Sequence, residues 1–183
     1  LDNNIGYIKL TSFTDKASHE ILVGLTKMKE HQNMQKVIID LRSNGGGLLG
    51  EAVDIVNLFI PKDQIVVETK GRIEEINRVY KTRNLPFDLD VPVVVLIDSY
   101  SASASEIVAG SIQDLDRGVI VGMQSYGKGL VQQTKDLSFG SKIKLTVAKY
   151  YTPSGRCIQK IDYSNKNNDG QSKEVPDSLI QTF

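Results

Sequence analysis

The chain has 183 residues, of which 40% are hydrophobic and 24% are charged, a composition typical of a soluble globular domain with a sizeable core. Lysine and arginine together number 22, as do aspartate and glutamate, so the formal net charge is zero and lacks the basic excess expected of a nucleic-acid-binding protein. We identify no targeting signal and no apolar run of membrane-spanning length, and therefore expect no transmembrane segment.

The first part of the chain predicts two strands that alternate with two helices. Residues 5–10 read as a strand, and a helix capped by Thr14 follows as far as about His31. The short apolar run 37–41 is typical of a strand buried on both faces of a sheet. Apolar residues spaced at i, i+3, i+4 and i+7 then predict a second helix, which ends before Pro61.

The middle of the chain predicts a strand pair over residues 65–69 and 76–81, followed by a loop. Residues 91–97 form the strongest strand pattern in the sequence, and Pro92 lies near its start, where a strand tolerates proline. A third helix begins near Ser103. Further strands are expected at residues 118–121, 131–137 and 142–151.

This order of strands and helices predicts a single α/β domain over residues 1–160, with a largely parallel central sheet flanked by helices. The polar residues 161–183 read as a loop or tail beyond it. Ligand sites in such sheets lie beyond the carboxyl ends of the strands. Glycines 45–47, the serines at 101–105 and Lys128 each follow an expected strand end, so we expect them to share one crevice.

The histidines and the cysteine do not indicate a metal site. His19 and His31 both fall in or beside the first expected helix, and Cys157 is the only cysteine, which rules out an internal disulfide. A metal site needs three or four converging ligands, and the sequence has no local cluster of them. We therefore expect neither a metal nor another cofactor.

Three serines in the stretch SASASE, residues 101–106, follow a buried strand and open a helix. A serine on such a strand-to-helix turn matches the nucleophile elbow of hydrolases, and the helix N-terminus offers N–H groups to an oxyanion. The same residues form a capping-box pattern, in which Ser103 caps the helix and Glu106 bonds back to it. The cap is the commoner role, and spacing alone does not select one nucleophile among Ser101, Ser103 and Ser105.

Two glycine-rich stretches are expected at the same crevice. Asn44 and glycines 45–47 do not match the dinucleotide pattern G-x-G-x-x-G, but their backbone can bring N–H groups close to a ligand. The stretch GMQSYGKG, residues 122–129, nearly spells a phosphate-binding loop. However, Gly129 stands in place of the hydroxyl residue, and the residues after it read as a strand rather than a helix.

Lys128 has three alternative roles: a phosphate ligand, an exposed lysine in a turn, which is the commonest, or a general base. A serine nucleophile needs a base, and a lysine can serve if it is neutral, which burial favours by disfavouring the ammonium form. Serine–lysine pairs are an established variant of the catalytic triad. The flanking glycines would allow the segment to pack tightly.

Four motifs occur in order and together resemble the C-terminal processing peptidases, also called tail-specific proteases. They are DLRSNGGG at residues 40–47, SASASE at 101–106, YGKGLVQ at 126–132 and YYTPSGR at 150–156. Any one motif is weak, but all four in order are specific, and the segment from Ile5 is also similar to the family's core. The resemblance implies an α/β fold like that of the crotonase and Clp-protease group, and it favours a catalytic role for the serines over a cap alone.

The resemblance also implies a role for five residues. Ser103 would be the nucleophile, Lys128 the general base and Gln132 the residue that positions this lysine. The backbone N–H groups of Gly47 and Ala104 would form the oxyanion hole, in which a single donor is typically worth about 3–4 kcal/mol in the transition state.

By the same resemblance, the chain is expected to be a serine endopeptidase of the bacterial cell envelope or periplasm that cleaves the C-terminal regions of protein substrates without a cofactor. Family members usually carry a PDZ domain, for which we see no room here, so we expect the peptidase core alone. Two alternatives remain: a catalytically silent peptide-binding module on the same fold, and a nucleotide-binding protein that uses GMQSYGKG.

Overall fold

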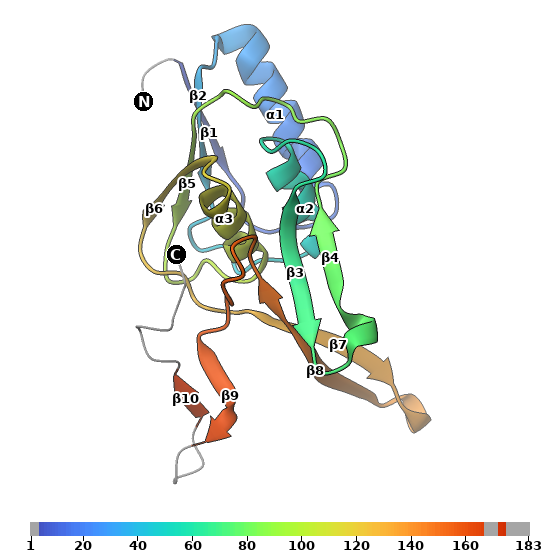
Figure 1. Cartoon of the computed structure of the whole chain (residues 1–183). Helices are drawn as coiled ribbons and strands as arrows, with labels where there is room; N and C mark the ends of the chain where they lie inside the picture. The colour runs from blue at the N-terminus through green and yellow to red at the C-terminus, as the bar shows by residue number, and fades with distance from the viewer. Residues whose placement is uncertain (1–3, 167–171, 175–183) are drawn as a thin grey trace.

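The fold is built on a four-stranded parallel sheet in the order β1-β2-β5-β6 (Figure 1). The computed structural model describes residues 4–166 and 172–174 of the chain. The central strands β2 and β5 consist largely of buried or half-buried Val and Ile residues, as their apolar runs predict. Each strand pairs in parallel with its neighbour, and the bounds are β1 (Ile5–Lys9), β2 (Lys36–Asp40), β5 (Val93–Ile97) and β6 (Gly118–Gly122).

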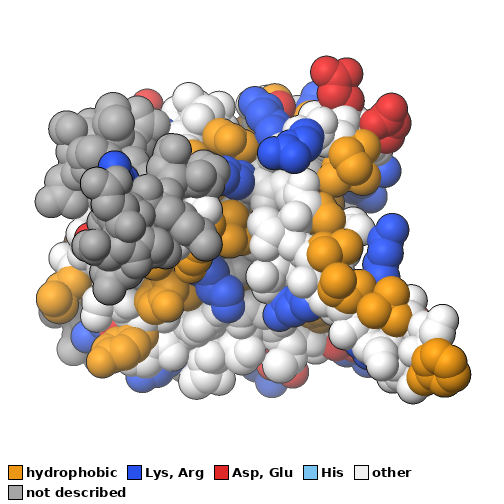
Figure 2. All heavy atoms as spheres, turned by 90° about the horizontal axis from the view of Figure 1, so that it is seen from below, with side chains coloured by type: hydrophobic (Ala, Val, Ile, Leu, Met, Phe, Trp, Pro, Cys, Tyr) orange, Lys and Arg blue, Asp and Glu red, His pale blue; other side chains and the backbone are white. Residues whose placement is uncertain are grey.

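A second, antiparallel sheet has the order β4-β3-β8-β7. Its strands are β3 (Ile65–Gly71), β4 (Arg78–Lys81), β7 (Leu130–Asp136) and β8 (Lys142–Tyr151). The predicted strand pair is present as β3 and β4, joined through the 3₁₀ helix η1 (Glu74–Ile76). β7 and β8 form a long hairpin closed by η2 (Ser138–Gly140), which projects from the body of the molecule. Figure 2 shows hydrophobic side chains along this hairpin, and Phe139 at its end is fully exposed.

The segment beyond residue 160 is not a loop or tail throughout. Strands β9 (Ile161–Lys166) and β10 (Ser172–Glu174) pair antiparallel in a two-stranded ribbon. The prediction of a polar loop or tail is therefore wrong for these residues, because pairing between neighbouring strands supplies backbone hydrogen bonds that composition does not reveal. The rest of that predicted segment lies outside the described residues.

Among the described residues, three α-helices connect the strands and flank the parallel sheet: α1 (Ala17–Gln32), α2 (Leu49–Asn57) and α3 (Ala104–Asp114). α3 lies between the two sheets in Figure 1, and the hydroxyl of its Ser111 donates a hydrogen bond to the Val66 carbonyl of β3 (2.8 Å). Apolar residues of the helices and of both sheets pack into one core. No helix among the described residues is long and apolar enough to cross a membrane.

Helix α1 begins at Ala17 rather than directly after the predicted cap at Thr14. The carboxylate of Glu51, which lies on α2, accepts hydrogen bonds from the N–H groups of Lys16 (3.1 Å) and Ser18 (2.7 Å). A side chain from another helix therefore satisfies the N-terminal donors that a local cap would otherwise serve. The sequence around Thr14 carries no sign of this long-range partner.

The carboxyl end of β2 is held by a buried carboxylate. Asp40 is fully buried and accepts a hydrogen bond from Tyr7 Oη on β1 (2.6 Å). It also accepts hydrogen bonds from the Arg42 backbone N–H (3.0 Å), Nε (2.9 Å) and Nη2 (2.7 Å). The hydrogen bonds from the Arg42 side chain hold the pKa of Asp40 well below its usual range. This cluster fixes the point from which the glycine loop departs.

Asp40→Asn should lower the free energy of unfolding by about 2 kcal/mol at pH 7, because it removes the charge from these hydrogen bonds. The folded-state pKa lies below the unfolded value of about 4, so ionised Asp40 stabilises the fold above that pH. Its contribution is lost as the pH falls toward the folded-state pKa. Between about pH 5 and pH 2, urea unfolding should therefore show a smaller loss of stability for Asp40→Asn than for the wild type.

The matched control is Asp136→Asn, since Asp136 forms an exposed ion pair with Lys142 (3.2 Å). An exposed pair contributes little, so this variant should change the free energy of unfolding by less than about 0.5 kcal/mol. If Asp40→Asn kept the wild-type dependence of stability on pH, the ionised carboxylate would not be what stabilises the end of β2.

Candidate active site

Three loops meet at the carboxyl ends of β2, β5 and β6, as expected of a parallel sheet: the glycine loop (residues 41–48), the serine loop (98–103) and the lysine loop (123–129). The N–H of Ala102, after β5, donates to the Asn44 carbonyl after β2 (3.0 Å). The N–H of Tyr126, after β6, donates to the Ser101 carbonyl after β5 (3.0 Å). Backbone hydrogen bonds therefore join the glycine loop to the serine loop, and the serine loop to the lysine loop.

Ser103 lies on a strained turn between β5 and α3. Its φ of 57° and ψ of −110° are values that residues with a side chain rarely adopt, and such strain costs of the order of 1–3 kcal/mol. Ser103 is the N-cap of α3 and forms the capping box with Glu106, whose Oε2 accepts a hydrogen bond from the Ser103 N–H (2.7 Å). The cap and the sharp turn that the sequence suggested are thus features of the same residue.

The glycine loop packs directly against Ser103. Gly46 has a φ of 100°, and a Cβ there would lie 2.9 Å from the Ser103 Cβ and 2.8 Å from the Ala102 carbonyl oxygen. Asn44, fully buried, holds this loop: its Nδ2 donates to the Leu10 carbonyl (2.8 Å), and its Oδ1 accepts from the Gly46 N–H (2.9 Å). Only a glycine at position 46 permits this close approach.

The backbone N–H groups of Gly47 and Ala104 have no hydrogen-bond acceptor among the described residues. Ala104 is the first residue of α3, so its N–H has no partner within the helix. Gly47 lies in the exposed part of the glycine loop. Both predicted oxyanion donors are therefore available to a ligand.

Lys128 is exposed, so burial, the condition that would favour a neutral lysine, is not met at this side chain. Its neighbours Gly127 and Gly129 are buried, and Cβ atoms added to them would lie 2.3 Å from Lys160 Cβ and 2.5 Å from the Gln159 N–H nitrogen, respectively. The segment packs tightly through its glycines, as expected, and this packing turns the lysine side chain outward. Within the described part of the chain, Nζ of Lys128 forms no hydrogen bond, and so none to Ser103 Oγ; the hydrogen bond of this residue is made by its backbone N–H.

Gln132 is also exposed and lies on β7. Its Nε2 donates to Thr146 Oγ1 on β8 at a long 3.4 Å and does not bond to Lys128. The segment after Lys128 is thus a strand, as predicted, whereas a phosphate-binding loop opens a helix. The backbone does not support a nucleotide site at GMQSYGKG.

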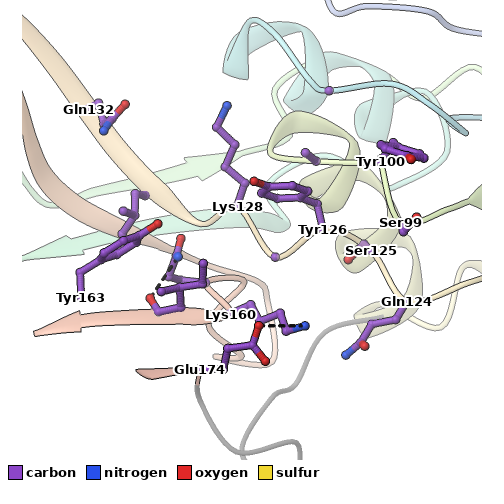
Figure 3. A pocket seen from close by; sticks show the side chains of 16 residues that line it. Ser99, Tyr100, Gln124, Ser125, Tyr126, Lys128, Gln132, Lys160, Tyr163 and Glu174 are labelled. Atoms are coloured by element: carbon purple, nitrogen blue, oxygen red, sulfur yellow. Dashed lines mark hydrogen bonds and ion pairs between the residues drawn. The ribbon is translucent and has the colours of Figure 1, made fainter. Parts of the chain in front are cut away.

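A cavity of about 730 Å³ opens beside the lysine loop. Its lining includes three half-exposed or exposed tyrosines, Tyr100, Tyr126 and Tyr163. Figure 3 shows the side chains of Lys128 and Tyr126 close together, with Tyr100 to their right and Gln132 apart on β7. Within the part of the chain that the structure describes, no group of His, Cys, Asp or Glu side chains converges in a way that could hold a metal ion.

Asp98 is a site residue that sequence reasoning missed. Its carboxylate accepts hydrogen bonds from the N–H groups of Ser43 (2.9 Å), Tyr100 (3.0 Å) and Ser101 (3.0 Å), and so ties the glycine loop to the serine loop. Partial burial raises the pKa of Asp98, but these hydrogen bonds outweigh it and hold the pKa below its ordinary value. The signal in the sequence is an acidic residue placed directly after a buried strand.

The comparison with known families and proteins identifies close relatives. The sequence pattern of peptidase family S41 matches residues 4–165. A carboxy-terminal-processing protease of Bartonella bacilliformis is 38% identical over 164 residues, which cover 88% of this chain and 38% of that protein. A carboxyl-terminal-processing protease of Synechocystis is 41% identical over 160 residues, or 86% of this chain and 36% of that protein. The chain thus spans well under half the length of these relatives.

Solved structures agree with the sequence comparison. The photosystem II D1 C-terminal processing protease superposes with a TM-score of 0.77 at 30% identity, over 94% of this chain and 41% of that chain. An S41 protease from Bacteroides fragilis superposes with a TM-score of 0.68 at 19% identity, over 82% of this chain and 43% of that chain, and supports the fold alone. With an α/β fold that matches these proteases and a family pattern that covers almost the whole described chain, this protein belongs to peptidase family S41 and, within it, to the C-terminal processing peptidases.

Proposed function

We propose that this chain is the catalytic core of a serine endopeptidase that hydrolyses peptide bonds in the C-terminal regions of protein substrates. The observation that carries the proposal is the turn at Ser103. Its strained backbone presents the residue at the N-terminus of α3, and the N–H groups of the next residue, Ala104, and of Gly47 in the adjoining glycine loop have no acceptor among the described residues. Strain of this kind is concentrated at functional sites, and unpartnered donors beside a serine suit a developing oxyanion.

In the proposed mechanism, Ser103 Oγ attacks the scissile carbonyl carbon while neutral Lys128 takes the hydroxyl proton. The N–H groups of Gly47 and Ala104 stabilise the oxyanion of the tetrahedral intermediate. The intermediate collapses to an acyl-enzyme as the leaving amine takes a proton from Lys128. Water then attacks the acyl-enzyme with Lys128 again as the base, which releases the carboxylate product and regenerates Ser103. Gln132 positions the lysine.

The exposed position of Lys128 sets a requirement for this mechanism. Its side chain must turn toward Ser103 when a substrate covers the cavity, and the flexible four-carbon stem of lysine allows this rotation. A bound peptide would also exclude water from Lys128 and so favour its neutral form. The tyrosines that line the cavity offer apolar faces and hydroxyl groups to an extended peptide.

A catalytically silent peptide-binding module is the competing function. The observation that favours it is that Lys128 Nζ forms no hydrogen bond with Ser103 or Gln132 among the described residues. The two functions differ in the reactivity of Ser103, because a silent serine is not acylated by a fluorophosphonate probe. Labelling of the wild type at Ser103 would favour the peptidase.

We further propose that the protein acts outside the cytoplasm, in the cell envelope. Its relatives include processing proteases of bacteria and of chloroplasts. A peptidase that cleaves unfolded C-terminal regions endangers nascent proteins in the cytoplasm, which favours its separation from them.

Ser103→Ala should abolish cleavage of an unstructured protein such as casein, lowering the rate by at least about a thousandfold, because no other group can form the acyl-enzyme. The loss of one hydroxyl should leave the fold intact. Gel-based digestion alongside the wild type measures the effect, and Ser141→Ala, at an exposed serine near the β7–β8 turn, is the control. Cleavage by Ser103→Ala at the wild-type rate would remove Ser103 from the mechanism.

Lys128→Arg should also be inactive, because the guanidinium group stays protonated and cannot accept the serine proton. Lys144→Arg, at an exposed lysine of β8, should retain wild-type activity. Peptide hydrolysis by the two variants alongside the wild type at one pH tests both statements. Activity in Lys128→Arg would exclude the general-base role.

Gly46→Ala should destabilise the fold by about 1–3 kcal/mol and lower peptide cleavage more than tenfold, because its Cβ would displace Ser103 and the Ala104 N–H. The adjacent Gly45→Ala is the control, since a Cβ there meets nothing within 4 Å. It should change the free energy of unfolding by less than about 0.5 kcal/mol. Equal effects of the two substitutions in urea unfolding would show that the approach of Gly46 to Ser103 is not what constrains the loop.

A further inference from the structure

Glu106 is fully buried at the start of α3, and its carboxylate accepts four hydrogen bonds. Oε1 accepts from Ser125 Oγ (2.7 Å) and from the Gly127 N–H (2.6 Å). Oε2 accepts from the N–H of Ser103 (2.7 Å) and from the N–H of Lys128 (2.9 Å). A capping box requires only the bond from Ser103. The other three bonds go to the lysine loop, which follows a different strand.

A single oxygen atom thus joins the backbone of Ser103 to the backbone of Lys128. These two residues lie in the loops after β5 and β6, and Oε2 fixes the distance between their main chains. We propose that Glu106 is the positioning residue of the dyad, which sets the register of the Lys128 loop against the Ser103 turn. This inference rests on the proposed function of Ser103 and Lys128. Catalysis depends on such placement, since a displacement of about 1 Å can cost a hundredfold in rate.

The chemistry of the four donors explains why this residue is a glutamate. Three backbone N–H groups and one hydroxyl converge on the side chain, and only an ionised carboxylate accepts at both ends without presenting a donor of its own. Burial raises the pKa of Glu106, and the four hydrogen bonds, which stabilise the charged form, offset this rise only in part. A buried charge is costly, and an apolar side chain would fill the same space at lower cost. Unlike an apolar side chain, the carboxylate fixes the position of the Lys128 loop relative to the Ser103 turn.

Glu106→Gln tests the proposal because glutamine keeps the shape of the side chain. Whichever way the amide is placed, its NH₂ group faces two donors, so one pair of hydrogen bonds is lost. We expect kcat for a reporter peptide to fall at least about tenfold, with KM changed by less than about twofold, because only the alignment of the reacting groups is altered.

The matched control is Glu51→Gln, in which a carboxylate that caps α1 through Lys16 and Ser18 is changed in the same way. It should weaken α1 and leave kcat unchanged. A fall in kcat of similar size in both variants would assign the effect of Glu106→Gln to a general loss of stability and overturn the proposal.

A second measurement does not depend on turnover. Amide hydrogen exchange, followed by NMR, should become faster at Ser103, Gly127 and Lys128 in Glu106→Gln, and it should remain slow there in Glu51→Gln. Wild-type exchange at these amides, or faster exchange with an unchanged kcat, would overturn the role of Glu106. If Glu106→Gln did not fold, Ser125→Ala, which removes one donor to Oε1, should speed exchange at Gly127 and Lys128, and unchanged exchange would be equally contradictory.

Failure of the proposed function gives a different result. In that case the wild type would not cleave the peptide, or Ser103→Ala would cleave it as well as the wild type. The exchange experiment would then still decide whether Glu106 holds the two loops together. An active wild type, an inactive Ser103→Ala and a fully active Glu106→Gln would reject the positioning role alone.

Discussion

β5 pairs in parallel with β2 on one side and with β6 on the other, and the arrangement of the site follows from this pairing. Parallel strands end at the same edge of a sheet, so three loops that are far apart in the sequence leave the sheet side by side. The glycine loop, the serine turn and the lysine loop then need only short hydrogen bonds to form one unit. The second sheet and the β9–β10 ribbon add the walls of the cavity around that unit.

Buried polar groups gather at this edge of the sheet. Asp40, Asn44, Ser101, Ser105 and Glu106 are all fully buried, whereas the core below them is made of apolar side chains. Every buried side-chain oxygen and nitrogen of the described residues has a hydrogen-bond partner. Buried polar groups are tolerated only when they are satisfied, and a satisfied network specifies one geometry. The apolar core therefore supplies the stability, and the polar network supplies the shape of the site.

Much of the fold was predictable because its signals are local. The apolar runs that became β2 and β5, the capping box at Ser103 and the strand after Lys128 were each visible in a few neighbouring residues. One missed feature depends on a partner far along the chain, because Glu51 caps α1 from another helix. The other is the pairing of β9 with β10, which is local but has a polar composition that does not indicate strands.

In the candidate site, too, local features were predictable and features set by distant packing were not. The glycine loop and the serine turn were predictable as backbone features, because glycine permits a positive φ and a serine before a helix marks its start, but spacing alone did not single out Gly46 or Ser103. The exposure of Lys128 does not follow, since the same flanking glycines that pack the backbone tightly decide which way the side chain must leave it. Spacing places a residue on a loop, but the direction of its side chain is set by packing from other segments, here residues 159 and 160.

The strained turn at Ser103 is held by contacts from several segments of the chain. A turn that costs of the order of 1–3 kcal/mol persists only when several independent contacts each favour it. Here the Ala102 N–H bonds to the glycine loop, Glu106 holds the Ser103 N–H, and Gly46 leaves no room for the turn to relax. Each contact comes from a different segment, so a change in one leaves the others in place but lets the turn move. The geometry of the serine is thus a property of the assembled loops and not of the SASASE stretch alone.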